Sequence, residues 1–322
     1  MPSAVTPSRP FACSCMLAFA LAAILFAVPF AESASAQSKD EKEILRTAER
    51  DAQIPRIADG VDGAKDGERL MLEIANGRLR LRSDAKADAT RISAVFTVDG
   101  VDAADAERRT KLVRLYAERA DEGTIIVGAY FPGKAMPRDS VELDVTAPPA
   151  QEAVLKSTDG VVEARGTTGK LRMITRNGEV IVSGHAGPVD ARAVNGRILV
   201  EGATDSVQAK STNGPVQIVL ADGNDNPFTL EARNGAVIVE VASDFDGVVT
   251  MLTANGRLGV VDPAKLVRVS EISSTRLVAE IGEAQGQSAI ATSNGAITLV
   301  RRTGPKADPA KPASGQPDTT RE

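Results

Sequence analysis

The sequence offers few side chains that could carry out catalysis. The single histidine, His185, stands between Gly184 and Gly187, where we expect a solvent-exposed corner with no carboxylate fixed beside it. The two cysteines, Cys13 and Cys15, both precede an apolar N-terminal run. We therefore predict no Ser-His-Asp site, no transition-metal site and no cofactor.

Paired carboxylates on neighbouring repeats would indicate polysaccharide cleavage, because such enzymes use two acidic groups. Trp is absent, which removes the commonest platform for stacking a sugar ring. The candidate carboxylates stand at differing distances from the repeated turn described below, so they form no single column: Glu163, Glu179, Glu201, Glu231 and Glu240. We predict that the protein is not an enzyme, with a polysaccharide-active β-helix enzyme as the alternative.

Two loops are rich in side-chain oxygen atoms. Residues 58–67 contain Asp-Gly three times, and Asp222–Asn226 is almost entirely Asp and Asn. Calcium is one interpretation, but the first loop lacks the closing acidic ligand of a calcium loop. Turns stabilised by Asp and Asn side chains explain both segments without a metal.

Arginine recurs beside the turns. Arg78, Arg197 and Arg257 follow an Asn-Gly pair, whereas Arg176 and Arg233 precede one. If the repeats stack in register, these side chains form a basic edge that can bind phosphorylated or carboxylated envelope polymers. The alternative is a solvated edge whose charges prevent sheet-to-sheet aggregation.

The elements that position these residues repeat along the chain. The repeated pairs are separated by 18, 18, 21 and 21 residues and are Asn177-Gly178, Asn195-Gly196, Asn213-Gly214, Asn234-Gly235 and Asn255-Gly256. Asp159-Gly160 lies 18 residues before the first pair, and Asn294-Gly295 lies 39 after the last. Periods of this length are typical of repeat architectures.

Apolar residues alternate on both sides of each turn, as in Leu171, Met173 and then Val180, Val182. Period two predicts strand, turn, strand, with positive φ at both turn residues. One repeat cannot bury its own apolar face, so several must stack. The predicted fold is all-β: a β-solenoid (β-helix-like) of 18–21-residue repeats with an irregular N-terminal β cap. An antiparallel β-sandwich or prism is the alternative.

The repeated Thr/Ala-x-Asn-Gly-x-Val-x-Val pattern resembles the bacterial putative-adhesin domain, an envelope-associated family of unknown function. Ser140–Pro148, which leads into Val154–Gly160, is similar to the strand that precedes the first repeat of that family. The resemblance covers about Leu70 to Val300 and carries over no catalytic motif. It implies a structural or interaction module of the cell envelope, with an envelope polymer or an envelope protein as partner.

Residues 1–36 have the features of an export signal: Arg9, the apolar run Met16–Phe30, and Ala34-Ser35-Ala36 before Gln37. Cleavage leaves an exported protein of the periplasm, envelope or exterior; an uncleaved segment would be a membrane anchor. The formal net charge of −5 and the 3% of aromatic residues argue against a nucleic-acid partner.

The remaining segments frame the repeats. Residues 37–69 are predicted to be a linker or short helix, 70–149 an N-terminal β region that caps the stack, and 150–300 the repeat region. The irregular segment after Val260 is expected to close the other end. Residues 301–322 are almost free of apolar side chains and are predicted to be a disordered tail. A self-assembling scaffold is a third hypothesis, which capping of both ends would disfavour.

Overall fold

The structure, a computed structural model, describes residues 45–55, 68–121 and 123–304. The predicted export signal, most of the 37–69 segment and the tail from residue 305 lie outside these ranges. Within them, no helix is long and apolar enough to span a membrane.

The all-β prediction is confirmed. The described strands form one hydrogen-bonded, mostly parallel sheet of 21 strands that does not close on itself. The described residues contain one helix, α1 (Ala103–Thr110).

Each repeat contributes one strand before its Asn-Gly pair and one after it. The strands before the pair are β8 (Lys170–Asn177), β10 (Val189–Asn195), β12 (Val207–Asn213), β14 (Phe228–Asn234), β16 (Gly247–Asn255) and β20 (Gln287–Asn294). The strands after it are β9 (Val180–Ser183), β11 (Ile198–Ala203), β13 (Val216–Leu220), β15 (Val237–Val241), β17 (Leu258–Val261) and β21 (Ile297–Arg301).

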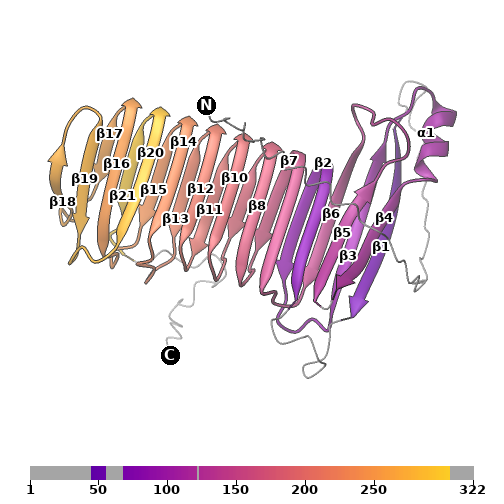
Figure 1. Ribbon diagram of the computed structural model, residues 1–322, viewed down its shortest axis with the longest axis horizontal. Helices are drawn as coiled ribbons and strands as arrows, with labels where there is room; N and C mark the ends of the chain where they lie inside the picture. The colour runs from indigo at the N-terminus through magenta and orange to yellow at the C-terminus, as the bar shows by residue number, and fades with distance from the viewer. Residues whose placement is uncertain (1–44, 56–67, 122, 305–322) are drawn as a thin grey trace, which may run out of the picture.

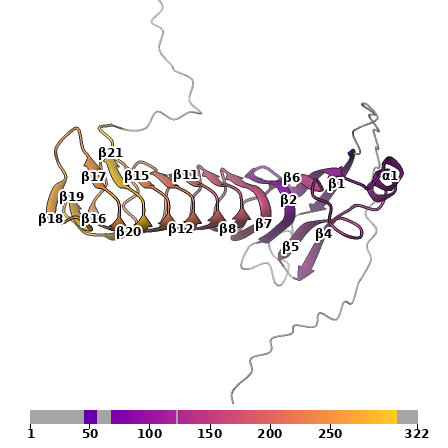
Figure 2. The same cartoon turned by 90° about the horizontal axis from the view of Figure 1, so that it is seen from above.

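Equivalent strands of neighbouring repeats pair in parallel and in register, so Asn195 lies opposite Asn177 and Asn213. The strands before the pairs form what we call the first column, and those after it the second column. Figure 2 shows the two columns as two layers along the molecule. The antiparallel alternative is therefore wrong for the repeats.

Two long strands, β2 (Arg69–Ser83) and β7 (Glu152–Arg165), continue through both columns and pair with each other in parallel. Asn76 of β2 lies opposite Asp159, as expected for a first copy of the repeat. The other N-terminal strands are β1 (Arg46–Pro55), β3 (Ala89–Val98), β4 (Arg114–Asp121), β5 (Thr124–Tyr130) and β6 (Ser140–Ala147).

The N-terminal β region ends both columns with antiparallel strands (Figure 1). On the first column, β4 pairs antiparallel with β5. On the second, β3 pairs antiparallel with β6 and β1. The 37–69 segment, predicted to be a linker or a short helix, is a strand at β1. Ala48, Ala52 and Ile54 alternate inward along β1, and pairing with β3 outweighs helix propensity.

The repeats do not stack in the order of the chain. Strands β20 and β21, which carry Asn294, lie between the Asn234 repeat and the Asn255 repeat in both columns. The intervening chain forms β18 (Arg268–Ile272) and β19 (Arg276–Ile281), and β19 pairs antiparallel with β16. The Asn255 repeat is therefore the last of the stack.

The core lies between the columns. Predicted inward residues such as Met173, Ile198 and Val239 are fully buried. Leu258 and Val260 are exceptions, because both stay partly exposed at the end of the second column. Their predicted burial is therefore incomplete.

Candidate functional site: the Asn-Gly corner and the basic face

The Asn side chains form a continuous amide ladder along the stack. Asn177 Nδ2 donates to Asp159 Oδ1 at 2.5 Å, and Asn195 Nδ2 donates to Asn177 Oδ1 at 2.7 Å. The same bond, at 2.8–3.0 Å, continues through Asn213, Asn234, Asn294 and Asn255. Every amide donates toward Asp159, whose carboxylate only has to accept, which explains why Asp replaces Asn at that position.

The glycines beside the ladder approach their neighbours too closely for a side chain. Gly178 N–H and Gly196 N–H donate to the Asn195 and Asn213 carbonyls, each at 2.9 Å. A Cβ on Gly196 would come far within 3.0 Å of the Gly178 carbonyl oxygen, and the same overlap recurs at the other corner glycines. The overlapping positions are Gly160, Gly178, Gly196, Gly214, Gly235, Gly256 and Gly295.

The predicted positive φ is found at Gly160, Gly178 and Gly214, but the prediction is wrong for the Asn residues of the turns. Among the described non-glycine residues, only Lys265 and Ala284 have positive φ, so the Asn residues are not left-handed. The chain does not reverse into a hairpin at the Asn-Gly pair; it bends from the first column into the second. Asn is used for its amide, and Gly for the close backbone approach.

A hydroxyl two residues before several Asn positions completes the corner. Thr175, Ser211, Thr253 and Thr292 each donate to the carbonyl of a corner glycine in an adjacent repeat, at 3.0–3.3 Å. All four side chains are buried. The corner is therefore a rigid, hydrogen-bonded spine.

The structure divides the predicted basic edge. Arg176 and Arg233 end strands of the first column, whereas Arg78, Arg197 and Arg257 lie just beyond the bend, at the start of the second. Arg197 contacts Glu179, with Nε 3.8 Å from Oε1. The repeats of Asn213 and Asn294 carry no arginine beside their pairs, so the five side chains form two interrupted rows.

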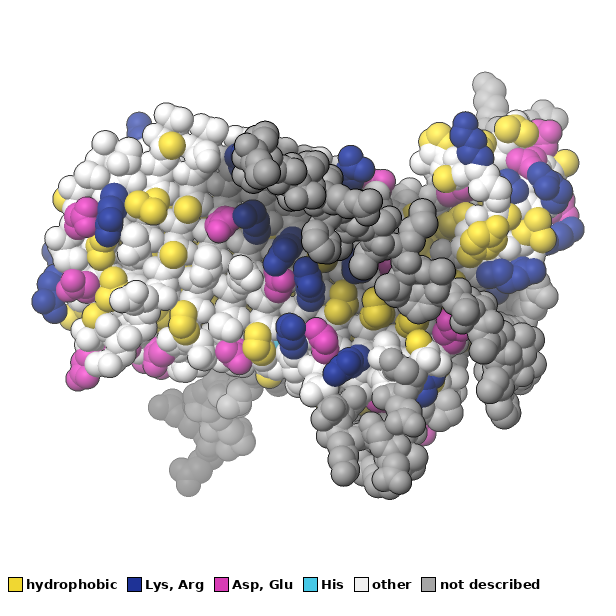
Figure 3. Space-filling model, in the orientation of Figure 1, with side chains coloured by type: hydrophobic (Ala, Val, Ile, Leu, Met, Phe, Trp, Pro, Cys, Tyr) yellow, Lys and Arg dark blue, Asp and Glu magenta, His cyan; other side chains and the backbone are white. Residues whose placement is uncertain are grey.

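A denser group of cations lies on the outer face of the first column. Strands β8, β10, β12 and β14 carry six cations, Lys170, Arg172, Arg176, Arg192, Lys210 and Arg233, against two carboxylates, Asp190 and Glu231. We call this surface the basic face; Figure 3 looks onto it. The sequence contains the signal, since these residues occupy the outward positions of predicted strands.

Ion pairs hold part of the basic face in place. Asp190 lies 2.8 Å from Arg192 Nε and 3.5 Å from Arg172 Nε, and Glu231 lies 2.5 Å from Lys210 Nζ. The side chains of Arg172, Arg192 and Lys210 remain 42–62% exposed. Exposed pairs of this kind contribute little to stability, so an incoming anion can exchange with them.

The glutamates considered for catalysis are not brought together. Glu201 and Glu240 share a register position, but Val219 lies between them. Glu163 is buried and contacts Arg80 and Arg165. The Asp222–Asn226 loop is held by Asn224, which is buried and donates to the carbonyls of neighbouring repeats. The described residues contain no cluster of three or more potential metal ligands among His, Cys, Asp and Glu.

The predicted exposure of His185 is wrong, because its side chain is fully buried. The turns that connect one repeat to the next stack on each other as well. Thr168 bridges Ala186 in parallel, and Thr167 Oγ1 lies 2.9 Å from His185 Nδ1. Nε2 is buried and makes no hydrogen bond with the described residues. Burial lowers the pKa of His185 below 6.5, although nearby backbone groups act in the opposite direction.

This burial predicts a loss of stability in mild acid. The unfolded chain takes up the proton below pH ~6.5 while the folded chain resists it, so stability is full above that pH and falls below it. The slope is at most ~1.4 kcal/mol per pH unit. We expect urea unfolding to show a smaller loss between about pH 7.5 and 5.5 for His185→Gln than for the unmodified chain. Equal losses would show that His185 is not the titrating group.

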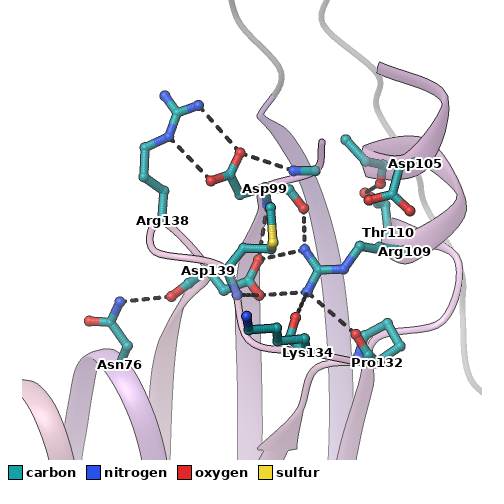
Figure 4. A network of polar contacts seen from close by, with 12 residues as sticks. Asn76, Asp99, Asp105, Arg109, Thr110, Pro132, Lys134, Arg138 and Asp139 are labelled. Atoms are coloured by element: carbon teal, nitrogen blue, oxygen red, sulfur yellow. Dashed lines mark hydrogen bonds and ion pairs between the residues drawn. The ribbon is translucent and has the colours of Figure 1, made fainter. Parts of the chain in front are cut away.

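A second polar network, shown in Figure 4, was not predicted. The buried Arg109 of α1 donates to Asp139 Oδ2 at 2.6 Å and Oδ1 at 3.1 Å, and to the carbonyls of Asp99, Pro132 and Lys134. Burial opposes ionisation of Asp139, but hydrogen bonds from Arg109 and two backbone amides outweigh it and lower its pKa. The network fastens α1 and residues 132–139 to the N-terminal β region.

Solved structures to which this chain is similar include two crystal structures. One is a putative cell adhesion protein from Clostridium sporogenes, at 10% identity and TM-score 0.31, covering 80% of this chain and all of that one. The other is a putative adhesin from Bacteroides fragilis, at 10% identity and TM-score 0.40, covering 79% of this chain and 97% of that one. The sequence matches no family model. It also matches no curated protein.

Proposed function

We propose that the protein is an exported, non-enzymatic, adhesin-like interaction module of the bacterial cell envelope. It is built as a β-solenoid and binds an anionic envelope polymer on the basic face. The observation that carries this proposal is the charge of four adjacent strands, which bear six cations and only two carboxylates in a chain of formal net charge −5. Such a local field attracts an anionic polymer.

The geometry of the stack suits a repeating ligand. Neighbouring strands of a sheet lie about 4.8 Å apart, so the cations are spaced in steps of that length along the axis. Arg192 and Lys210 are one such step apart, in a row that Ile174 and Glu231 continue on either side. A polymer lying along the axis can therefore meet several cations at once, and weak contacts add up.

Arg176 and Arg233 belong to both the predicted edge and the basic face. Both are exposed, and each directly precedes the ladder Asn that ends its strand. Guanidinium groups bind carboxylates and phosphates in a bidentate manner, so these two residues extend the face toward the corner. Arg78, Arg197 and Arg257 lie beyond the bend and are assigned no main role.

The test compares two triple variants of residues 37–322 that lose the same charge. One carries Arg176→Gln, Arg192→Gln and Lys210→Gln; the other carries Arg78→Gln, Arg197→Gln and Arg257→Gln. Binding to polygalacturonate and to polyphosphate is measured at low and high salt, with dextran as a neutral control. Three contacts of ~0.5 kcal/mol each predict about tenfold weaker binding for the basic-face variant.

We expect the second variant to bind nearly as the unmodified chain does, and salt to weaken binding by the unmodified chain. Equal loss in both variants would place binding outside the basic face. Reducing ends are followed in the same samples. Shortened polygalacturonate would overturn the non-enzymatic proposal.

A further inference from the structure

The two columns end differently at the C-terminal end of the stack. The first column continues past β16 into the antiparallel strands β19 and β18. The second column stops at β17, whose one partner among the described strands is β21. At the opposite end both columns finish in antiparallel strands. The predicted closure after Val260 therefore covers only one column.

No described strand covers the core where the second column stops. Ile297 and Leu299, in the adjacent strand β21, are 0% exposed, as are Val237 and Val239 one repeat further in. Leu258 and Val260 occupy the same positions in β17 and are partly exposed. Leu258 and Val260 point inward like their equivalents in the other repeats. They are more exposed because no further described strand stacks on β17.

Exposed apolar side chains gather at the same end. They are Val261, Leu266, Val269 and Ile272, and Ile272 is 74% exposed. All five residues of β18 are exposed, and within the described chain this strand pairs with β19 alone. Figures 1 and 2 place β17, β18 and β19 at the extreme end of the molecule. An unpaired, apolar edge of this kind is a template for another strand.

We propose that this open end is the interface of a tail-to-tail homodimer, in which β18 pairs antiparallel with β18 of a second copy. The sequence of the strand is complementary to itself. Pairing about the point between Val269 and Ser270 sets Arg268 opposite Glu271 of the second copy, and Val267 opposite Ile272 of the second copy. Opposite charges and apolar pairs facing each other across strands stabilise such a pairing.

The arrangement is symmetric and closed. One two-fold axis repeats each contact, which is the commonest form of a homodimer and leaves no β18 edge for a third copy. The N-terminal end differs, because both of its columns finish in antiparallel strands and neither stops as the second column does at β17. The dimer joins the two first columns into one sheet, with the ends of the two second columns on the same side of it.

The two charges are accessible. Arg268 is 75% exposed, with Nε 3.6 Å from Glu280, and Glu271 is 51% exposed, with Oε2 3.1 Å from Arg276 Nε. Both intrachain pairs are on the surface and exchange readily with a new partner. A bulge between Val269 and Glu271 restricts the register of the edge.

Sedimentation equilibrium of residues 37–322 tests the dimer with a charge exchange. R268E alone and E271R alone are each expected to weaken dimerisation at least tenfold, because like charges then face each other. The double variant R268E/E271R regains the dimer. A mixture of the two single variants forms heterodimers, because each chain then supplies the charge that the other lacks.

R91E, which changes an exposed arginine of β3, is the matched control and leaves the mass unchanged. Circular dichroism and thermal unfolding confirm that each variant is folded. A monomer at every concentration would overturn the proposal. The open end would then be covered by other parts of the chain or by a different protein. So would a dimer that neither single variant weakens, or a mixture that fails to associate.

Discussion

Gly196→Ala is expected to unfold the repeat region or to destabilise it by about 4 kcal/mol or more. A Cβ at this position would overlap the Gly178 carbonyl oxygen, which belongs to the backbone of the adjacent repeat. The strands cannot separate to relieve the overlap without breaking the amide ladder between Asn177 and Asn195. Urea unfolding followed by circular dichroism measures the change.

Gly259→Ala is the matched control. Gly259 lies in β17 and has no heavy atom within 4 Å of an added Cβ. Its φ lies outside the left-handed region, so alanine fits the backbone without strain. We expect a change within ~0.5 kcal/mol, as for other surface substitutions. Similar losses in the two variants would mean that the corner glycines are not kept for close approach.

Arg109→Met is expected to cost ~3–5 kcal/mol, because it leaves the Asp139 carboxylate buried without its cation. Asp139 is 5% exposed and keeps only the Met136 and Asp99 amides as donors in that variant. Arg108→Met is the control, since the Arg108 side chain is 69% exposed on the same helix. We expect that change to cost less than ~0.5 kcal/mol.

Acid provides a second readout for the same pair. The pKa of Asp139 is lowered in the folded chain, so its contribution is present above the unfolded value of ~3.9 and is lost as pH falls through the folded value. Without Arg109 this carboxyl is easier to protonate. The stability gap between Arg109→Met and the unmodified chain should therefore narrow at low pH; a constant gap would contradict the ion-pair account.

The sequence predicted the repeating strands because period two and the Asn-Gly column are local patterns. It misidentified why Asn is present. An Asn that adopts a left-handed turn and an Asn whose amide bonds to the next repeat would recur at the same interval along the sequence. Alignment of the repeats at their outward positions would have located the basic face. No spacing links Arg109 to Asp139, which come together only through the packing of α1.

The order of the repeats could not be predicted for a related reason. Each repeat offers the same backbone edge, the same Asn and the same Gly, so the Asn294 repeat fits equally well between Asn234 and Asn255 or beyond Asn255. The β18–β19 segment decides between these positions by covering the outer edge of β16. Likewise, the glycines around His185 suggested an exposed corner, whereas stacking of Thr168 on Ala186 buries it.

The stacking order underlies the corner, the basic face and the open end, and engineered disulfides test it most directly. Residues 37–322 contain no cysteine, so two introduced cysteines form a single possible bond. Thr229 lies opposite Ala289, and Ala289 lies opposite Thr250, all on the outer face. Disulfides need Cα atoms about 4.4–6.8 Å apart, while strands two apart are separated by about 9.6 Å.

We therefore expect Thr229→Cys with Ala289→Cys to form a disulfide under mild oxidation. Thr229→Cys with Thr250→Cys should remain reduced. Mass spectrometry of proteolytic fragments identifies the bond in each case. A disulfide in the second pair and none in the first would show that the repeats follow chain order, which contradicts the insertion of β20 between β14 and β16.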